Sequence, residues 1–242
     1  MQFYRRPKPI KAISFDLDDT LYDNAPVIAR LETELMQWLY QRFPITQHVS
    51  AMQWQQLKQQ IARAYPELSE DLAALRRETI VVMLKQLGVS TVAVAQAAQE
   101  GMALVAVMRN QIDVPHETHQ VLKQLAAHYP LVAITNGNAD IAQIGIDQYF
   151  EFALHGGVNG AAKPASDLFV LATERLGIDM GGLLHVGDHL DSDVAGAKKA
   201  GAMACWINLH HRRMRLRSEG LALPDLEITA LSQLLPLLPT SA

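Results

Sequence analysis

The stretch that most constrains the fold is residues 12–21, AISFDLDDTL. A mostly apolar run, residues 12–15, ends at three carboxylates within four residues. A short apolar run that stops at polar residues is typical of a buried strand in a parallel sheet. Because ligands bind at the carboxyl ends of such strands, Asp16 and Asp18 are predicted to lie at the mouth of a site. Two adjacent carboxylates there require a cation or a shared proton to offset their repulsion.

The second half of the chain alternates between strand and helix patterns. Strands are predicted at 131–134, 152–155, 183–186 and 202–207, and helices between them include one over 139–149. This alternation predicts an α/β fold, with a Rossmann-like parallel sheet and right-handed crossovers. Residues 1–9, which contain two prolines, are expected to be a lead-in, and residues 231–238 a short amphipathic helix.

Residues 23–112 have a different pattern, in which apolar residues recur at helical spacing and no strand is evident. About four helices are expected there, which is too long for an ordinary crossover connection. We therefore predict an inserted helical-bundle cap over 23–112, between the two parts of the core, 1–22 and 113–242. Its aromatic residues, Trp38, Trp54 and Tyr65, are candidates for stacking on a substrate ring, although Trp38 falls on the apolar stripe.

Composition narrows the class of protein. The chain has 242 residues, of which 49% are apolar, and a formal net charge of −4. This charge argues against electrostatic nucleic-acid binding, so the basic run 210–217 is interpreted as a solvated loop and helix. No apolar run approaches the length of a membrane span. A cytoplasmic protein is expected, and the sequence leaves monomer or homodimer open.

Polar residues at the predicted strand ends form a set suited to phosphoryl transfer. Asp16 can act as a nucleophile, and Asp18 is close enough to act as the acid and base. Asp188, with Asp16 and a backbone carbonyl near Asp18, supplies the oxygen ligands that Mg²⁺ prefers. The sequence therefore predicts a Mg²⁺ site beside the nucleophile.

Three further residues are candidates for binding the phosphate oxygens. Thr135 and Asn136 follow one predicted strand, and Lys163 opens the helix before the next one. The hydroxyl of Thr135, the amide of Asn136 and the ammonium of Lys163 can hold the equatorial oxygens, where charge spreads in the transition state.

The four motifs FDLDDTL, ITNG, KP and GDHLDSD resemble, in order, those of the haloacid dehalogenase superfamily. The resemblance covers the core, and the helical block lies where that superfamily inserts a helical cap. It implies Asp16 as nucleophile, Asp18 as acid/base, Thr135 and Lys163 as phosphate ligands and Asp188 as metal ligand. Asp193 matches the final acid of the last motif, which is expected to support the metal from outside its ligand shell.

Within the superfamily the chain resembles most the bacterial phosphatases that act on flavin mononucleotide and on 5-amino-6-(5-phospho-D-ribitylamino)uracil in riboflavin biosynthesis. Alternatives are a phosphatase of other nucleotides or sugar phosphates, a phosphomutase, a dehalogenase and a catalytically silent binding module. The intact acids, Asp18 among them, favour phosphate chemistry over dehalogenation. His189 is interpreted as a loop histidine and His185 as a core histidine with its hydrogen bonds satisfied.

Overall fold

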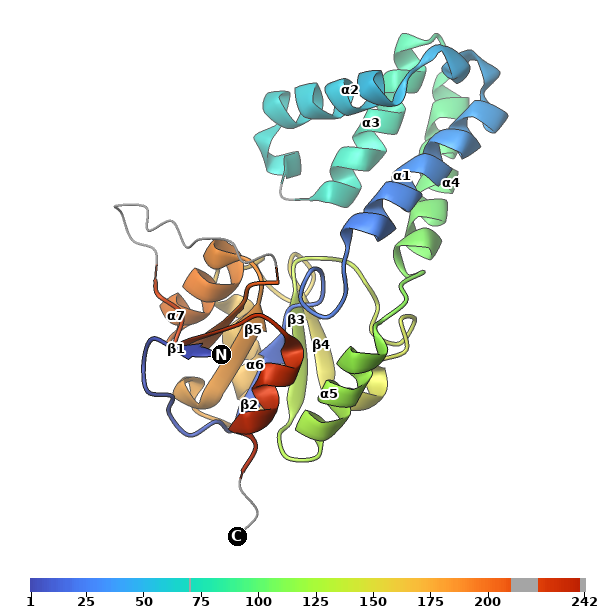
Figure 1. Ribbon diagram of the computed structural model, residues 1–242. Helices are drawn as coiled ribbons and strands as arrows, with labels where there is room; N and C mark the ends of the chain where they lie inside the picture. The colour runs from blue at the N-terminus through green and yellow to red at the C-terminus, as the bar shows by residue number, and fades with distance from the viewer. Residues whose placement is uncertain (70, 210–221, 240–242) are drawn as a thin grey trace. The chain divides into compact units, whose positions relative to one another are not determined.

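The computed structural model of the chain describes residues 1–69, 71–209 and 222–239 (Figure 1). The chain divides into two compact units. The first joins residues 1–25 to residues 112–242, and the second comprises residues 26–111.

A seven-stranded sheet forms the centre of the first unit, in the order β1-β7-β6-β5-β2-β3-β4. All neighbouring strands are parallel except β1 and β7, which pair antiparallel at one edge. The predicted α/β fold is therefore confirmed. The strands are β1 (Gln2–Phe3), β2 (Ala12–Phe15), β3 (Leu131–Thr135), β4 (Phe152–His155), β5 (Leu183–Gly187), β6 (Met203–Ile207) and β7 (Leu226–Ile228).

The central strand β2 lies between β3 and β5. Phe15 is aligned with Ala133 on β3 and with Val186 on β5. Every residue of these three strands is buried, as expected for parallel strands that are covered on both faces. The chain therefore leaves all three strands at the same edge of the sheet, where ligands bind in this architecture.

Helices cover both faces of the sheet, and each face has its own apolar core. On one face α5 (His116–Ala126) and the 3₁₀ helix η6 (Leu231–Leu237) pack against a cluster that includes Phe15. On the other face α6 (Asp167–Leu176) and α7 (Gly196–Ala200) pack against a cluster that includes Trp206. Short helical turns complete this unit: η3 (Asp147–Tyr149), η4 (Met180–Gly182) and the π-helical η5 (Leu190–Ala195).

The second unit is helical, as its periodicity predicts. It contains α1 (Ala25–Arg42, whose first residue belongs to the other unit), α2 (Ala51–Ala64), α3 (Leu72–Gln86) and α4 (Thr91–Arg109), with 3₁₀ turns η1 (Pro44–His48) and η2 (Pro66–Ser69). Ser50 and Gln53 form a capping box at the start of α2. Gly88 follows α3 and has φ 77°. Glycine adopts this left-handed conformation without strain, so the chain can leave the helix here.

Helix α4 meets the length and composition criteria for a membrane span, contrary to the expectation from the sequence. Its buried face contributes Val94, Ala97 and Val105 to the apolar core of the helical unit. A core helix of a soluble protein has the same properties, so α4 by itself is weak evidence for a membrane segment.

The structure differs from the sequence predictions at two places. The helix predicted over 139–149 is wrong: residues 141–145 form a turn, which ends at Gly145 with φ 74°, and only η3 follows. The lead-in 1–9 contains β1, which pairs with the unpredicted β7. These strands have two and three residues, too few for a period-2 pattern to be recognised.

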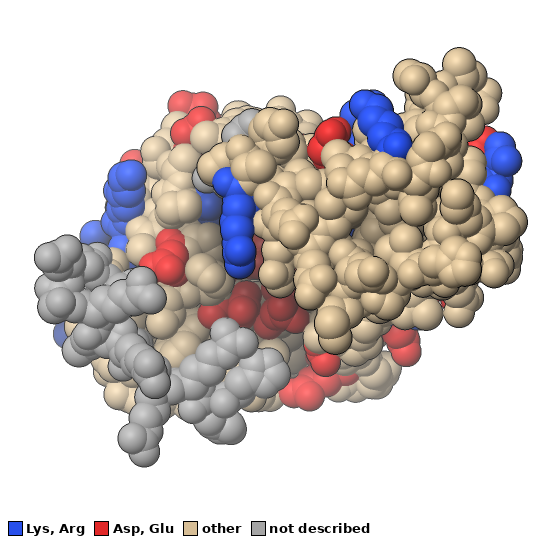
Figure 2. Space-filling model, turned by 90° about the horizontal axis from the view of Figure 1, so that it is seen from above, with Lys and Arg blue, Asp and Glu red and all other residues tan. Residues whose placement is uncertain are grey.

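Figure 2 shows the charged side chains on one face of the molecule. On the face seen from above in Figure 2, the coloured Lys and Arg side chains lie in several separate places, with acidic side chains between them. The basic run 210–217 lies outside the described residues.

Candidate active site

The turn after β2 presents the two acids of the first motif. The backbone N–H of Asp16 donates to the carbonyl of Val186 at 2.9 Å, which extends the pairing of β2 with β5. Asp19 then adopts φ 57°, a left-handed conformation that turns the chain back. The hydroxyl of the buried Tyr22 donates to Oδ1 of Asp18 at 2.7 Å. Tyr22 therefore orients the Asp18 carboxyl group, a role for which the sequence motif gave no signal.

Lys163 lies at the centre of a buried ionic cluster. Its Nζ donates to Oδ1 of Asp16 at 2.9 Å, to Oδ1 of Asp193 at 2.6 Å and to the carbonyl of Ile134 at 2.7 Å. Its side chain is 1% exposed, so these three acceptors engage all three donors of the ammonium. Lys163 thus links the acid at the end of β2 to the acid in η5.

Asn136 holds the backbone of Lys163. Its side-chain amide donates to the Lys163 carbonyl and accepts from the Lys163 N–H, both at 2.8 Å. The hydroxyl of Thr135, which is buried, accepts from the N–H of Gly137 at 2.9 Å and so closes the turn after β3. The structure therefore brings these predicted residues together, with the Asn136 side chain engaged in positioning Lys163.

Asp193 is packed directly over the end of β5. A Cβ atom added to Gly187 would lie 2.3 Å from Cγ of Asp193, so only glycine permits this approach. Oδ2 of Asp193 accepts from the backbone N–H of His189 at 2.9 Å, while Oδ1 faces Lys163. The glycine of the GD motif thus makes room for the motif's last acid.

The predicted core histidine, His185, is buried and has two side-chain partners. Its Nδ1 lies 2.9 Å from Oγ of Ser14, and its Nε2 lies 3.3 Å from Oδ1 of Asp193. The interpretation of His185 as a satisfied core histidine agrees with these contacts. No local sequence pattern connects His185 or Ser14 to the acids of the site.

Three carboxylates form a group that could hold a cation. Asp16, Asp188 and Asp193 each offer an oxygen, and these oxygens lie within 4.8 Å of one another. Such a set of hard oxygen donors suits Mg²⁺. The backbone of Asp188 is fixed by Trp206, whose Nε1 donates to the Asp188 carbonyl at 2.8 Å.

Burial and charge move the pKa values of this cluster apart. Burial, with the nearby charges of Asp193 and Asp18, raises the pKa of Asp16 to about 7, although Lys163 opposes this rise. Burial acts in the same direction on Asp193, but Lys163 and His185 outweigh it and hold the pKa of Asp193 well below its usual value. Two neighbouring carboxyl groups with separated pKa values are typical of catalytic sites.

The two bases of the cluster are also affected. Burial disfavours the charged form of Lys163, but Asp16 and Asp193 together raise the pKa of its ammonium above the ordinary value. Burial lowers the pKa of His185 to about 4, although Asp193 opposes the change. At neutral pH the cluster therefore contains a charged lysine and a neutral imidazole.

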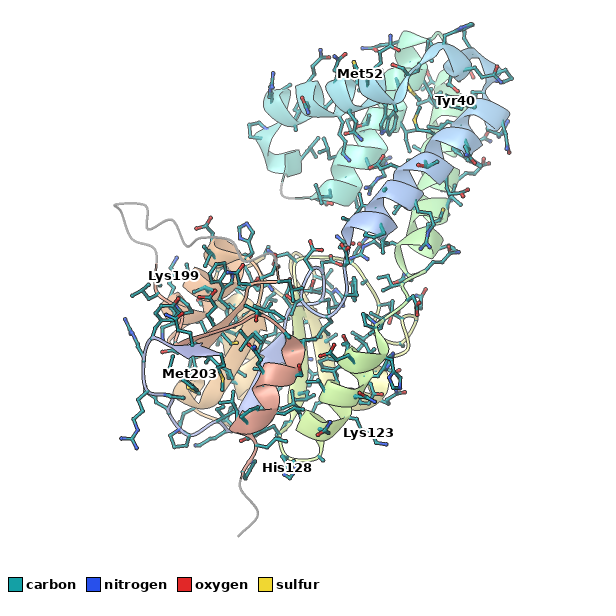
Figure 3. The ribbon with its side chains drawn as sticks, in the orientation of Figure 1. Tyr40, Met52, Lys123, His128, Lys199 and Met203 are labelled. Carbon is teal, nitrogen blue, oxygen red and sulfur yellow. The ribbon has the colours of Figure 1, made fainter. Side chains whose placement is uncertain are left out.

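The helical unit contains a second ionic cluster, formed around Glu32. This carboxylate accepts from Arg76 Nη2 at 3.0 Å, Lys58 Nζ at 2.9 Å and Trp54 Nε1 at 3.0 Å. Trp54 is 1% exposed, so in this conformation it is not available to stack on a substrate. Met52, two residues earlier on α2, is 71% exposed (Figure 3).

Comparison with known proteins identifies the class. Residues 10–201 match the model of the haloacid dehalogenase-like hydrolases. The chain therefore belongs to the haloacid dehalogenase-like hydrolase family, and the expected resemblance is confirmed.

Individual relatives place the chain among the phosphatases of that family. It is 42% identical over 238 residues to the 5-amino-6-(5-phospho-D-ribitylamino)uracil phosphatase YigB of Escherichia coli (strain K12), a match that covers 98% of this chain and 100% of that protein. It is 33% identical over 124 residues to the pyrimidine 5′-nucleotidase YjjG of the same organism, covering 49% of this chain and 53% of that protein. The chain is an enzyme, a phosphatase of this family.

Among solved structures, the fold is similar to the crystal structure of a 2-haloacid dehalogenase from Pseudomonas syringae pv. Tomato DC3000. The TM-score is 0.82 at 35% identity, and the match covers 93% of this chain and 96% of that chain. The same fold thus occurs in proteins named as phosphatases and in one named as a dehalogenase.

Proposed function

We propose that the chain is a Mg²⁺-dependent phosphomonoesterase that works through an aspartyl-phosphate on Asp16. The observation that carries this proposal is the buried cluster in which Lys163 joins Asp16 to Asp193, with Asp18 and Asp188 beside it. Four carboxyl groups near one ammonium repel a phosphate dianion unless a cation is added, which supports the metal requirement.

In the first step Oδ2 of Asp16 attacks phosphorus and the bond between phosphorus and the ester oxygen breaks. Oδ1 is the oxygen that accepts from Lys163, which leaves Oδ2 as the attacking atom. Asp18, protonated, gives its proton to the departing alkoxide. Because Tyr22 donates to Oδ1 of Asp18, the proton is carried on Oδ2.

In the second step the Asp18 carboxylate takes a proton from water, and the resulting hydroxide attacks the phosphorus. The bond from phosphorus to Asp16 breaks, so phosphate leaves and both carboxyl groups return to their starting states. Asp16, Asp188 and the backbone near Asp18 would hold Mg²⁺, which neutralises the phosphate charge when bound. Asp193 would act mainly through Lys163 and would support the metal from outside its ligand shell.

The phosphate oxygens are proposed to meet Thr135, the amide of Asn136 and Lys163, whose ammonium would exchange one of its three present acceptors for a phosphate oxygen. Thr135 and Asn136 lie at the end of β3, and Lys163 lies in the segment before α6. Two hydrogen bonds join Asn136 to the backbone of Lys163. Fixed donors of this kind stabilise transition-state charge without reorganising during the reaction. The helical unit is proposed to act as the cap that excludes water and selects the leaving group.

For the substrate we propose 5-amino-6-(5-phospho-D-ribitylamino)uracil, with flavin mononucleotide as a second ribityl phosphate. The support is the 42% identity to the Escherichia coli phosphatase over nearly the whole of both chains. We propose a role in riboflavin biosynthesis, in the cytoplasm. A pyrimidine nucleotide is the alternative substrate, supported by the shorter match to the nucleotidase.

The test is phosphate release from a panel of esters, with Mg²⁺ and with a chelator. The panel contains the two ribityl phosphates, pyrimidine and purine mononucleotides and hexose phosphates. We expect Mg²⁺-dependent release, fastest from the ribityl phosphates. Equal, weak release from all esters would contradict the substrate proposal, and halide release from a 2-haloacid without phosphate release would contradict the reaction.

A further inference from the structure

A buried chain of hydrogen bonds runs from the middle of β2 to the ionic cluster. Ser14 and His185 are directly aligned partners on β2 and β5, and their side chains meet at 2.9 Å. His185 then reaches Oδ1 of Asp193 at 3.3 Å, the same oxygen that accepts from Lys163. All of these side chains are buried, so water does not replace a lost partner.

The partners of His185 determine which ring nitrogen carries the proton. A carboxylate only accepts hydrogen bonds, so the Nε2 that faces Asp193 must carry the hydrogen. Nδ1 of a neutral imidazole is then an acceptor, and the Ser14 hydroxyl must donate to it. The opposite tautomer would place a lone pair of Nε2 against the carboxylate.

We propose that Ser14 and His185 are positioning residues for the reaction. Ser14 donates to Nδ1 and holds the imidazole ring in the orientation in which Nε2–H faces Asp193, and His185 holds Asp193 in the orientation that directs Lys163 onto Asp16. This inference rests on the proposed function, since it assigns the pair a role in placing the nucleophile and its lysine.

The surroundings of the pair argue against a purely space-filling role. The neighbours of His185 on β5, Leu184 and Val186, are apolar and fully buried, and the ring of Phe169 packs edge-on against the imidazole at 5.0 Å. A buried hydroxyl and imidazole in such a place each carry a desolvation cost that an apolar pair would avoid. The chain of hydrogen bonds from Ser14 through His185 ends on Asp193, so the groups that carry this desolvation cost are connected to the site.

Loss of His185 leaves Oδ1 of Asp193 with Lys163 alone, while Oδ2 keeps the backbone N–H of His189. The carboxylate is then held by one hydrogen bond fewer, and the position of Lys163 relative to Asp16 is less tightly fixed. Residues that orient the groups in contact with a metal or substrate typically contribute about 10- to 100-fold to activity. Because no substrate contact is lost, the effect should fall on kcat and leave KM nearly unchanged.

The experiment compares His185→Leu, His185→Gln and Ser14→Ala with the wild type in kcat, KM and thermal unfolding. The control is Thr173→Val, which removes a buried hydroxyl on α6 that donates to the carbonyls of Phe169 and Val170. We expect His185→Leu to lower kcat by about 10- to 100-fold. His185→Gln should recover most of it, because its amide nitrogen takes the place of Nε2. Equal kcat values for His185→Leu and Thr173→Val would overturn the proposal.

A second measurement, the ¹⁵N NMR spectrum of the imidazoles, does not depend on turnover. In the wild type the ring of His185 should carry its proton on Nε2, and in Ser14→Ala the ¹⁵N signal of Nδ1 should shift because this nitrogen has lost its hydrogen-bond donor. A wild-type proton on Nδ1 would overturn the inference. If the wild type released no phosphate from any ester, the proposed function would fail, whereas the tautomer would still report on the Ser14–His185–Asp193 geometry.

Discussion

The two units of this protein each contain a buried ionic cluster, and the clusters have opposite charge balances. In the helical unit one carboxylate, Glu32, is bonded by two cations, Arg76 and Lys58. In the α/β unit one ammonium, Lys163, is shared by two carboxylates, Asp16 and Asp193.

The difference in charge balance gives the carboxylates different chemistry. Burial opposes ionisation of Glu32, but Arg76 and Lys58 outweigh it and lower its pKa, so Glu32 stays charged and has no proton to transfer. In the α/β unit one carboxyl pKa is raised to about 7 and the other is lowered. A carboxylate paired with two cations stabilises the helical bundle. A cluster with excess negative charge can instead bind a cation and take part in catalysis.

The largest expected effect comes from Asp16→Asn. The variant keeps the volume of the side chain but removes the nucleophile, so turnover should fall by at least about a thousandfold. The circular dichroism spectrum should be unchanged. The assay requires protein free of host phosphatase, and Asp191→Asn, on an exposed residue of η5, is the matched control that should retain activity. Retained turnover in Asp16→Asn would contradict the catalytic role of the cluster around Lys163, and with it the contrast to the structural cluster around Glu32.

Gly187→Ala tests the packing of Asp193. The added Cβ would lie 2.3 Å from Cγ of Asp193, so this carboxylate must move and Lys163 must follow. We expect about a hundredfold loss of kcat, together with a lower midpoint of thermal unfolding. Gly145→Ala, at a position with φ 74° and no atom within 4 Å of an added Cβ, is a control for backbone strain alone. Equal activities in the two variants would contradict the packing argument.

Glu32→Gln tests whether the ionic cluster of the helical unit stabilises the fold. The change leaves Arg76 and Lys58 without their carboxylate, and we expect a loss of about 2–3 kcal/mol in the free energy of unfolding, measured with urea. Trp54→Phe, which removes one donor to Glu32 and part of a buried ring, should cost about 2–3 kcal/mol. Mg²⁺ binding, measured by calorimetry, should be unchanged in both. A large loss of Mg²⁺ affinity with unchanged stability would reverse the roles assigned to the clusters.

The smallest expected effect is a pH dependence of the metal-free protein. A carboxyl group whose pKa is raised to about 7 by folding contributes stability below its unfolded pKa and loses it as the pH rises through 7. Relative to Asp16→Asn, the wild type should therefore lose about 2 kcal/mol between pH 5 and pH 8. His185, with its pKa lowered to about 4, acts in the opposite direction as the pH falls, but it is common to both proteins and cancels.

Chelator keeps the metal out of this titration, and unfolding is followed by urea at each pH. Added Mg²⁺ should reduce the loss of wild-type stability at high pH, because the ion binds the ionised form of Asp16. A wild type whose stability rises between pH 5 and pH 8 as steeply as that of Asp16→Asn would contradict the raised pKa.

The parts of the fold with strong local signals were predictable from the sequence. Buried parallel strands are continuous apolar runs, so β2, β3 and β5 and the acids or turns that end them could be recognised. The helices of the second unit follow from their apolar periodicity. The helix predicted over 139–149 does not form because Gly145, in the left-handed conformation, ends the first turn. The apolar residues around Gly145 have a helix-like spacing in spite of this glycine.

The candidate site was predictable in its residue types but not in its connections. Motif order brings Asp16, Lys163 and Asp193 to one edge of the sheet. That Tyr22 orients Asp18, or that Ser14 and His185 bond to each other, depends on the alignment of β2 with β5 and on rotamers that no local pattern encodes. The two hydrogen bonds between the Asn136 side chain and the Lys163 backbone likewise join residues 27 positions apart, which no local pattern encodes.

The central claim is that Asp16 forms a covalent bond to phosphorus. The most direct measurement is rapid acid quenching of the enzyme during turnover of a ribityl phosphate with Mg²⁺, followed by mass spectrometry of the peptide that contains residues 12–21. We predict that a fraction of this peptide gains the mass of one phosphoryl group on Asp16, and that Asp16→Asn gains none. Burst release of the alcohol with no phosphorylated peptide, or with the phosphoryl group on another residue, would contradict the account.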